Sequence, residues 1–141
     1  MTPNPYEPPQ ASGSAATVAA ARRGPFVLAA VGAFLAGGYW ALITLLLVAG
    51  VAAGSVSGAQ IILPVILIGL YIQRGTQLLR GDARAASRIL WLHGVGGVVA
   101  IMQMQSSSGL FVTLQGLKVV IHVFGGVTAL LALRSASRPS P

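Results

Sequence analysis

Four long apolar runs, separated by short polar segments, fill most of the chain after residue 24. The runs cover residues 25–51, 59–80, 83–105 and 109–133. A membrane-spanning helix needs about 20 consecutive and mostly apolar residues, and each run reaches that length. The pattern therefore predicts an all-α fold, a bundle of four transmembrane helices.

Two of the connections between the runs are short and uncharged, and they predict how the helices pair. Residues 54–58 (GSVSG) join the first and second runs, and residues 106–109 (SSSG) join the third and fourth. Short connections hold consecutive helices antiparallel. We therefore expect two antiparallel hairpins between disordered tails at residues 1–24 and 134–141, of which the first is rich in Pro, Ser and Ala.

Charged residues are few, and the basic ones fall on one side of this layout. Only 8% of the residues are charged, against about 25% in a soluble domain, so a soluble fold could not cover its surface. The arginines lie in the tails or around the connection between the second and third runs: Arg22, Arg23, Arg74, Arg80, Arg84, Arg88, Arg134 and Arg138. Because basic connections stay in the cytosol, we expect a multi-pass membrane protein with both termini cytosolic.

The net charge of +7 does not indicate nucleic-acid binding, because the arginines are spread between apolar runs rather than gathered on one soluble face. Membrane lipids with anionic head groups are the expected partners. Small residues at helical spacing, such as Gly32 and Ala36, would also let a second copy or another membrane protein pack closely. The chain has no cysteine, which excludes disulfides and cysteine-based metal sites.

Polar residues within the fourth run are the best candidate for a site. Gln115, Lys118 and His122 fall on one face of a helix with 3.6 residues per turn. Lys118 is the only lysine in the chain, and an ionisable residue at membrane depth indicates function. No carboxylate lies within the apolar runs, so a charged Lys118 would need water, an anionic lipid or ligand, or a glutamine carbonyl such as that of Gln103.

A second interpretation of Lys118 requires no function. If the span begins at Leu114, Lys118 lies roughly 6 Å inside the outer boundary at 1.5 Å per residue. A lysine stem can carry its ammonium group to the surface from that depth. The sequence favours this snorkelling interpretation over a polar pathway or ligand site.

The third and fourth runs share the pattern H-x-x-G-G-V-x-A, which begins at His93 and again at His122, the only two histidines. A duplicated hairpin, or an inverted repeat of the kind seen in transporters, would produce this similarity, but so would the abundance of Gly, Val and Ala. Two histidines on neighbouring helices could ligate haem iron or another metal. Their depths, roughly 10 Å and 16 Å from the cytosolic boundary at 1.5 Å per residue, fit poorly with facing ligands. We predict neither a cofactor nor a metal site.

No catalytic pattern stands out in the chain. Ser106–Ser108 lie in a turn without a base and an acid to activate them, and the Gly-Gly pairs lie within helices rather than in a phosphate-binding loop. The sequence predicts a non-enzymatic protein with a structural or interaction role in the inner membrane. The alternatives are a minor transporter or channel that uses the polar stripe, and, less favoured, a haem-binding membrane protein.

The layout resembles that of small uncharacterised four-span inner-membrane proteins of bacteria with GC-rich genomes. The features that carry the resemblance are the leader Asn4–Pro9 (NPYEPP), the Ala/Gly/Val-rich helices and the arginine-rich middle connection. It covers the whole chain in layout and rests on no specific motif. The resemblance implies an inner-membrane protein and assigns no functional residue.

Overall fold

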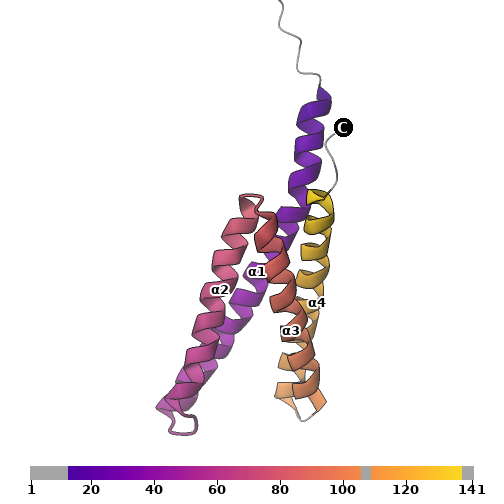
Figure 1. Cartoon of the computed structure of the whole chain (residues 1–141). Helices are drawn as coiled ribbons and strands as arrows, with labels where there is room; N and C mark the ends of the chain where they lie inside the picture. The colour runs from indigo at the N-terminus through magenta and orange to yellow at the C-terminus, as the bar shows by residue number, and fades with distance from the viewer. Residues whose placement is uncertain (1–12, 106–108, 138–141) are drawn as a thin grey trace, which may run out of the picture.

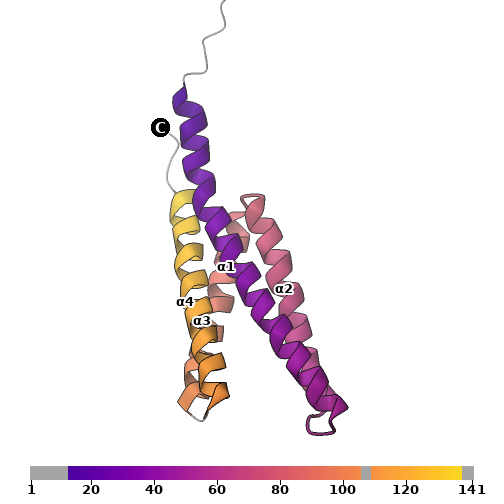
Figure 2. The same cartoon turned by 180° about the vertical axis from the view of Figure 1, so that it is seen from behind.

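The computed structural model of the protein describes residues 13–105 and 109–137, with side chains from Arg23 onward. Four long helices run down, up, down and up in a bundle in the view of Figure 1, and the view from behind shows the same arrangement (Figure 2). The elements are α1 (Gly13–Ala52), the 3-10 turn η1 (Gly58–Ile61), α2 (Ile62–Leu79), α3 (Ala83–Gln105) and α4 (Leu110–Ala136). The predicted all-α bundle of four helices is confirmed.

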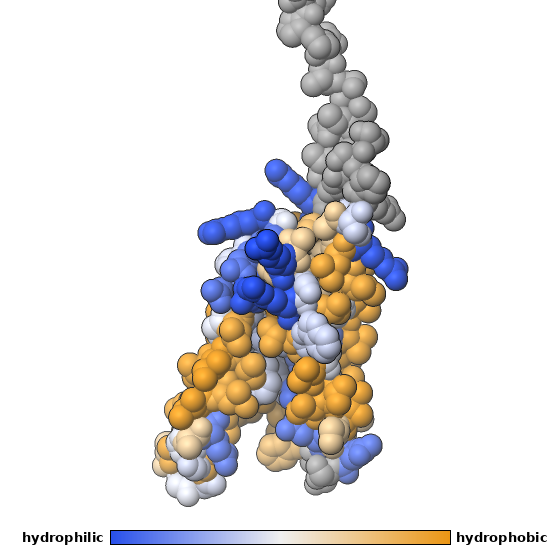
Figure 3. All heavy atoms as spheres, in the orientation of Figure 1, coloured by the Kyte–Doolittle hydropathy of each residue, from blue (hydrophilic) through white to orange (hydrophobic). Residues whose placement is uncertain are grey.

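Each of the four helices is long and apolar enough to cross a membrane. Large apolar side chains point outward along all of them, for example Leu45, Ile66, Val98 and Val120. Figure 3 shows this apolar surface between two more hydrophilic ends. An outward face of this kind is stable in lipid and unstable in water, so the chain has the features of a multi-pass membrane protein.

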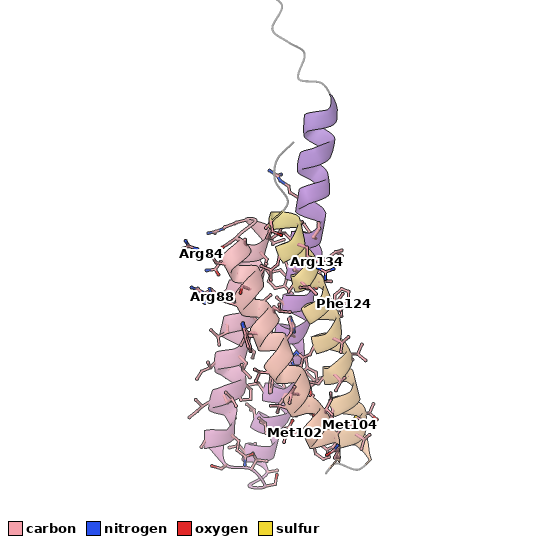
Figure 4. All side chains as sticks on the ribbon, turned by 45° about the vertical axis from the view of Figure 1, so that its right-hand side comes forward. Arg84, Arg88, Met102, Met104, Phe124 and Arg134 are labelled. Atoms are coloured by element: carbon pink, nitrogen blue, oxygen red, sulfur yellow. The ribbon has the colours of Figure 1, made fainter. Side chains whose placement is uncertain are left out.

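The arginines of the described residues gather at one end of the bundle, which we call the arginine end. In Figure 4, Arg84, Arg88 and Arg134 lie toward the end where α2 meets α3, whereas Met102 and Met104 lie near the opposite end. At the arginine end, Gly81 adopts a positive φ of 79° after α2. The Asp82 carboxylate then accepts a hydrogen bond from the backbone N–H of Arg84 at 2.8 Å, which caps the start of α3.

The predicted helix limits are close to the observed ones, except at the two ends of the chain. α1 begins at Gly13 rather than Pro25, so the prediction that residues 13–24 are disordered is wrong. This segment is rich in alanine, the residue with the highest helix propensity, and it extends beyond the other helices (Figure 1). α4 likewise continues past Leu133 to Ala136. The remaining predicted tails, 1–12 and 138–141, lie outside the described residues.

The helices pack most closely at the arginine end. The fully buried residues there are mostly alanines: Ala29, Ala30, Ala33, Leu78, Ala85, Ala86, Ile89, Ala129 and Ala132. Small side chains let helix backbones approach each other in a membrane. Toward the two uncharged turns, the α1–α2 hairpin and the α3–α4 hairpin diverge (Figures 1 and 2). This divergence leaves room between the hairpins for a cleft.

Candidate functional site

A cleft of about 240 Å³ lies between the two hairpins, and all four helices contribute to its walls. Figure 3 shows the surface hollowed between α2 and α3, below the arginine end. The lining residues are Trp40 of α1, Leu63, Leu67 and Tyr71 of α2, Leu92, Val95, Gly96, Val99 and Gln103 of α3, and Lys118 and His122 of α4. The walls are therefore mainly apolar, with a small number of polar groups from α2, α3 and α4.

Lys118 is buried in the wall of this cleft, with only 3% of its surface exposed. Its Nζ donates a hydrogen bond to Gln103 Oε1 at 3.3 Å and lies 4.8 Å from the centroid of the Trp40 ring. The snorkelling interpretation of Lys118 is wrong, because α4 turns this face into the bundle, where an amide oxygen and an aromatic face meet the ammonium group. The suggested glutamine carbonyl partner, Gln103, is confirmed.

No carboxylate of the described residues lies near Lys118. Asp82 is the only acidic residue in the part of the chain that the structure describes, and it caps α3 at the arginine end. A glutamine oxygen and an aromatic ring stabilise a cation without neutralising it. Apart from His122, the cleft lining therefore contains one basic side chain, Lys118, and no acidic one.

The two histidines meet behind the cleft. His93 Nδ1 and His122 Nδ1 are 3.1 Å apart, and both side chains are buried. The predicted difference in depth between the two histidines is wrong, because each depth was counted from its own helix end. Counted from the turn that the helices share, the positions match: His93 lies 13 residues before Ser106, and His122 lies 13 residues after Gly109. In an antiparallel hairpin, residues equally far from the turn face each other.

The two H-x-x-G-G segments, one in α3 and one in α4, pack against each other in a reciprocal way. The ring of His122 lies against Gly96, where a Cβ atom would come within 2.5 Å of Nε2. The ring of His93 lies against Gly125 in the same way and leaves even less room there. Each histidine thus occupies the space above the other helix's glycine, as a local two-fold axis between α3 and α4 would require. Only glycine permits this approach at either position.

This reciprocal packing leaves little scope for haem ligation. Metal–nitrogen bonds of about 2.0–2.1 Å on each side would need about 4 Å between the two ligating nitrogens, and a porphyrin would have to enter between the helices. The facing Nδ1 atoms are closer than that, and each Nε2 packs against glycine without a hydrogen-bond partner. Among the described residues, no cluster of three or more His, Cys, Asp or Glu could hold a metal ion.

Tyr71 connects the histidine pair to α2, and Trp40 connects Lys118 to α1; neither aromatic residue was predicted from the sequence. Tyr71 is almost fully buried and packs on both rings, with centroids 5.3 Å from His93 and 6.3 Å from His122. Its hydroxyl donates to the Leu92 carbonyl oxygen at 3.4 Å. Tyr71 and Trp40 are polar-tipped aromatic residues in the middle of apolar runs, which is the signal that could have identified them.

The predicted polar stripe comes together only in part. Lys118 and His122 line the cleft, Gln103 joins them from α3, and His93 reaches the site through His122. Gln115 is not a lining residue; it is half-buried, and its buried Oε1 has no hydrogen-bond partner among the described residues. Four of the five candidate residues thus belong to one connected site.

Comparisons of the chain with models of protein families, with curated proteins and with solved structures give no match. The resemblance to four-span bacterial proteins therefore extends to the layout alone, four helices able to cross a membrane.

Proposed function

We propose that this protein is a non-enzymatic membrane protein that binds a small amphipathic molecule in the cleft between its hairpins. The observation that carries the proposal is the ammonium group of Lys118, buried in the wall of a mainly apolar cleft. Binding sites for small molecules are typically apolar hollows with a few well-placed polar groups. The cleft combines these features within one chain.

A purely structural role, the function that the sequence alone favours, accounts for less of the geometry. It fits the alanine-rich arginine end, where the helices contact each other closely. It does not account for Lys118, because an apolar residue there would remove the energetic penalty of a buried cation without a carboxylate partner. A role in ligand binding would explain why a lysine is buried at this position.

A channel through a single chain has less support than a binding cleft. The lining residues reach from Gln103 and Lys118 to Tyr71 and Leu92. Beyond them, toward the arginines, lie fully buried residues such as Leu78 and Ile89. A cleft that is closed at one end suits binding, and its side between α2 and α3 suits entry from the bilayer.

We also propose that the protein is not an enzyme and that it lies in the bacterial inner membrane with both termini cytosolic. The cleft lining contains no Ser, Thr, Cys, Asp or Glu that could act with His122 as a nucleophile or as an orienting acid. The shared arginine end supports a cytosolic position for that end. The cleft would then open in the outer half of the bilayer.

Two tryptophans in different environments make the proposal testable. Trp40 lines the cleft, whereas Trp91 is 74% exposed on the outward face of α3. In a Trp91→Phe variant, tryptophan fluorescence, excited selectively over that of tyrosine, comes from Trp40 alone. We expect brominated single-chain amphiphiles, added to this variant in lipid nanodiscs, to quench Trp40 saturably because a bromine atom enters the cleft. A Trp40→Phe variant should show only the gradual quenching of a lipid-exposed Trp91.

Filling the cleft provides a matched control. Val95 lines it and Val98 does not, although both are exposed residues of α3. In the single-tryptophan background, Val95→Phe should weaken saturable quenching at least about tenfold, equivalent to about 1.4 kcal/mol, and Val98→Phe should leave it unchanged. Absence of saturable quenching with every probe would overturn the proposed function, as would equal effects of the two substitutions.

A further inference from the structure

We infer that the molecule held in the cleft carries a single negative charge on a compact oxyanion head group and one apolar chain. This inference rests on the proposed function and specifies the ligand class. It follows from three properties of the described residues: the uncompensated charge in the cleft, the unused hydrogen-bonding capacity of Lys118, and the size and apolar nature of the walls.

The charge balance of the cleft calls for one anion. Lys118 is its only basic side chain apart from the histidine, and His122 is hydrogen-bonded to His93 through Nδ1. Asp82 lies at the other end of α3 and cannot serve Lys118. A buried ammonium ion is stabilised strongly only by a charge of opposite sign. One positive group without an acidic neighbour matches one negative charge and disfavours a dianion.

The hydrogen-bonding geometry calls for an oxyanion. An ammonium group has three N–H donors, and the hydrogen bond to Gln103 Oε1 uses one of them. The face of the Trp40 ring lies on another side of the group. Oxygen atoms of a carboxylate or a phosphodiester would accept from the remaining N–H groups as charge-assisted hydrogen bonds, which are about twice as strong as neutral ones.

The apolar side chains of the cleft walls indicate that the ligand has an apolar chain next to that head group. Leu63 and Leu67 of α2 face Val95 and Val99 of α3 across the cleft. The cleft, at about 240 Å³, is smaller than the roughly 300–1,000 Å³ of pockets that enclose a drug-sized ligand. It can hold a head group and the first part of a chain, and the rest of the chain would pass between α2 and α3 into the bilayer.

The test compares four brominated probes with the same chain on the Trp91→Phe variant in nanodiscs of zwitterionic lipid. The probes are a carboxylate, a phosphodiester monoanion, an uncharged glycerol ester and a quaternary ammonium ion, each at a matched mole fraction in the membrane. We expect at least one oxyanion to quench Trp40 at about tenfold lower mole fraction than the uncharged ester. The better of the two anions then identifies the source as a free fatty-acid type or a lipid type.

Substitutions at Lys118 sharpen the result. Lys118→Met should remove the preference for anions to within about twofold while the uncharged ester still quenches, and Lys118→Arg should retain the preference. Thermal unfolding of each variant shows whether it folds. If Lys118→Met does not fold, the comparison of anionic and uncharged probes on the parent protein decides alone.

The outcomes separate this inference from the function on which it rests. Saturable quenching that is as strong with the uncharged ester or the ammonium probe as with both anions would overturn the ligand class and leave the proposed function standing. An anion preference that survives in a folded Lys118→Met variant would also overturn it. If no probe quenches saturably, both the proposed function and the ligand class fail.

Discussion

The two ends of the bundle differ in the size of their inward-facing apolar residues and in how closely their helices pack. At the arginine end, alanines of α1, α3 and α4 bring the helices into close contact around Leu78 and Ile89. At the end with the uncharged turns, the hairpins diverge, and larger residues such as Leu63 and Val99 line a cleft instead of interlocking. Figure 1 shows how α2 and α3 diverge with distance from the arginine end.

The contrast shows which force closes a helical bundle in a membrane. Lipid tails are as apolar as leucine, so no hydrophobic effect drives the hairpins together, and close packing of small residues must do so. Where the small residues end, an open cleft has no hydrophobic penalty, because lipid or a ligand can fill it. A binding site can therefore persist beside a tightly packed region of the same four helices.

The largest difference between the two ends should appear on truncating leucines. Leu78 is fully buried at the arginine end, whereas Leu63 lines the cleft and is 61% exposed. Leu78→Ala should lower the free energy of unfolding, measured in mixed micelles of mild detergent and dodecyl sulfate, by about 2–5 kcal/mol through lost packing. Leu63→Ala should change it by less than about 0.5 kcal/mol. Equal losses at the two sites would show that the ends pack alike.

A smaller effect should appear at the glycines of the reciprocal packing. Gly125→Ala places a methyl group against the His93 ring, so we expect a loss of about 1–3 kcal/mol in the same unfolding measurement. Gly116 lies on the same helix with open space around it, and Gly116→Ala should be neutral or slightly stabilising. Gly96→Ala should resemble Gly125→Ala if the local two-fold packing of the histidines is correct. A tolerated alanine at both positions would contradict it.

The smallest effect concerns the contact across the open end between Trp40 of α1 and Lys118 of α4. A double-mutant cycle of Trp40→Leu and Lys118→Met should give a coupling energy of about 0.5–2 kcal/mol, the range for a cation over an aromatic ring. The corresponding cycle with Trp91, which faces outward, should be additive. Coupling indistinguishable from that control would mean that Trp40 does not hold Lys118.

Much of the fold could be predicted from the sequence because the length and polarity of each apolar run indicate a helix independently of the rest of the chain. The four apolar runs, the short uncharged turns and the placement of the arginines predicted the bundle of two hairpins. The start of α1 at Gly13 was missed because an alanine-rich segment without a periodic apolar face was interpreted as a disordered tail. Helix propensity, rather than hydrophobic pattern, determines the structure of that segment.

The candidate site was predicted only as a set of residue types. The sequence identified Lys118, His122, His93 and Gln103, since polar groups stand out in apolar runs. The sequence could not show that Lys118 faces Trp40 inside the bundle or that the two histidines meet, because both contacts depend on the rotation and the register of α3 and α4. The sequence did contain information on this register, because the two histidines lie equally far from the turn that α3 and α4 share.

The sequence by itself determined that this chain forms four apolar helices with the arginines of the described residues at one end, since the length and polarity of each run decide whether it can cross a bilayer. Only the tertiary structure decided that Lys118 turns inward, that each histidine packs on the other helix's glycine, and that a cleft opens between the hairpins. Those features depend on how close two backbones approach and which faces they turn to each other. Hydrophobicity does not encode either in a membrane, because every apolar face is equally well solvated by lipid.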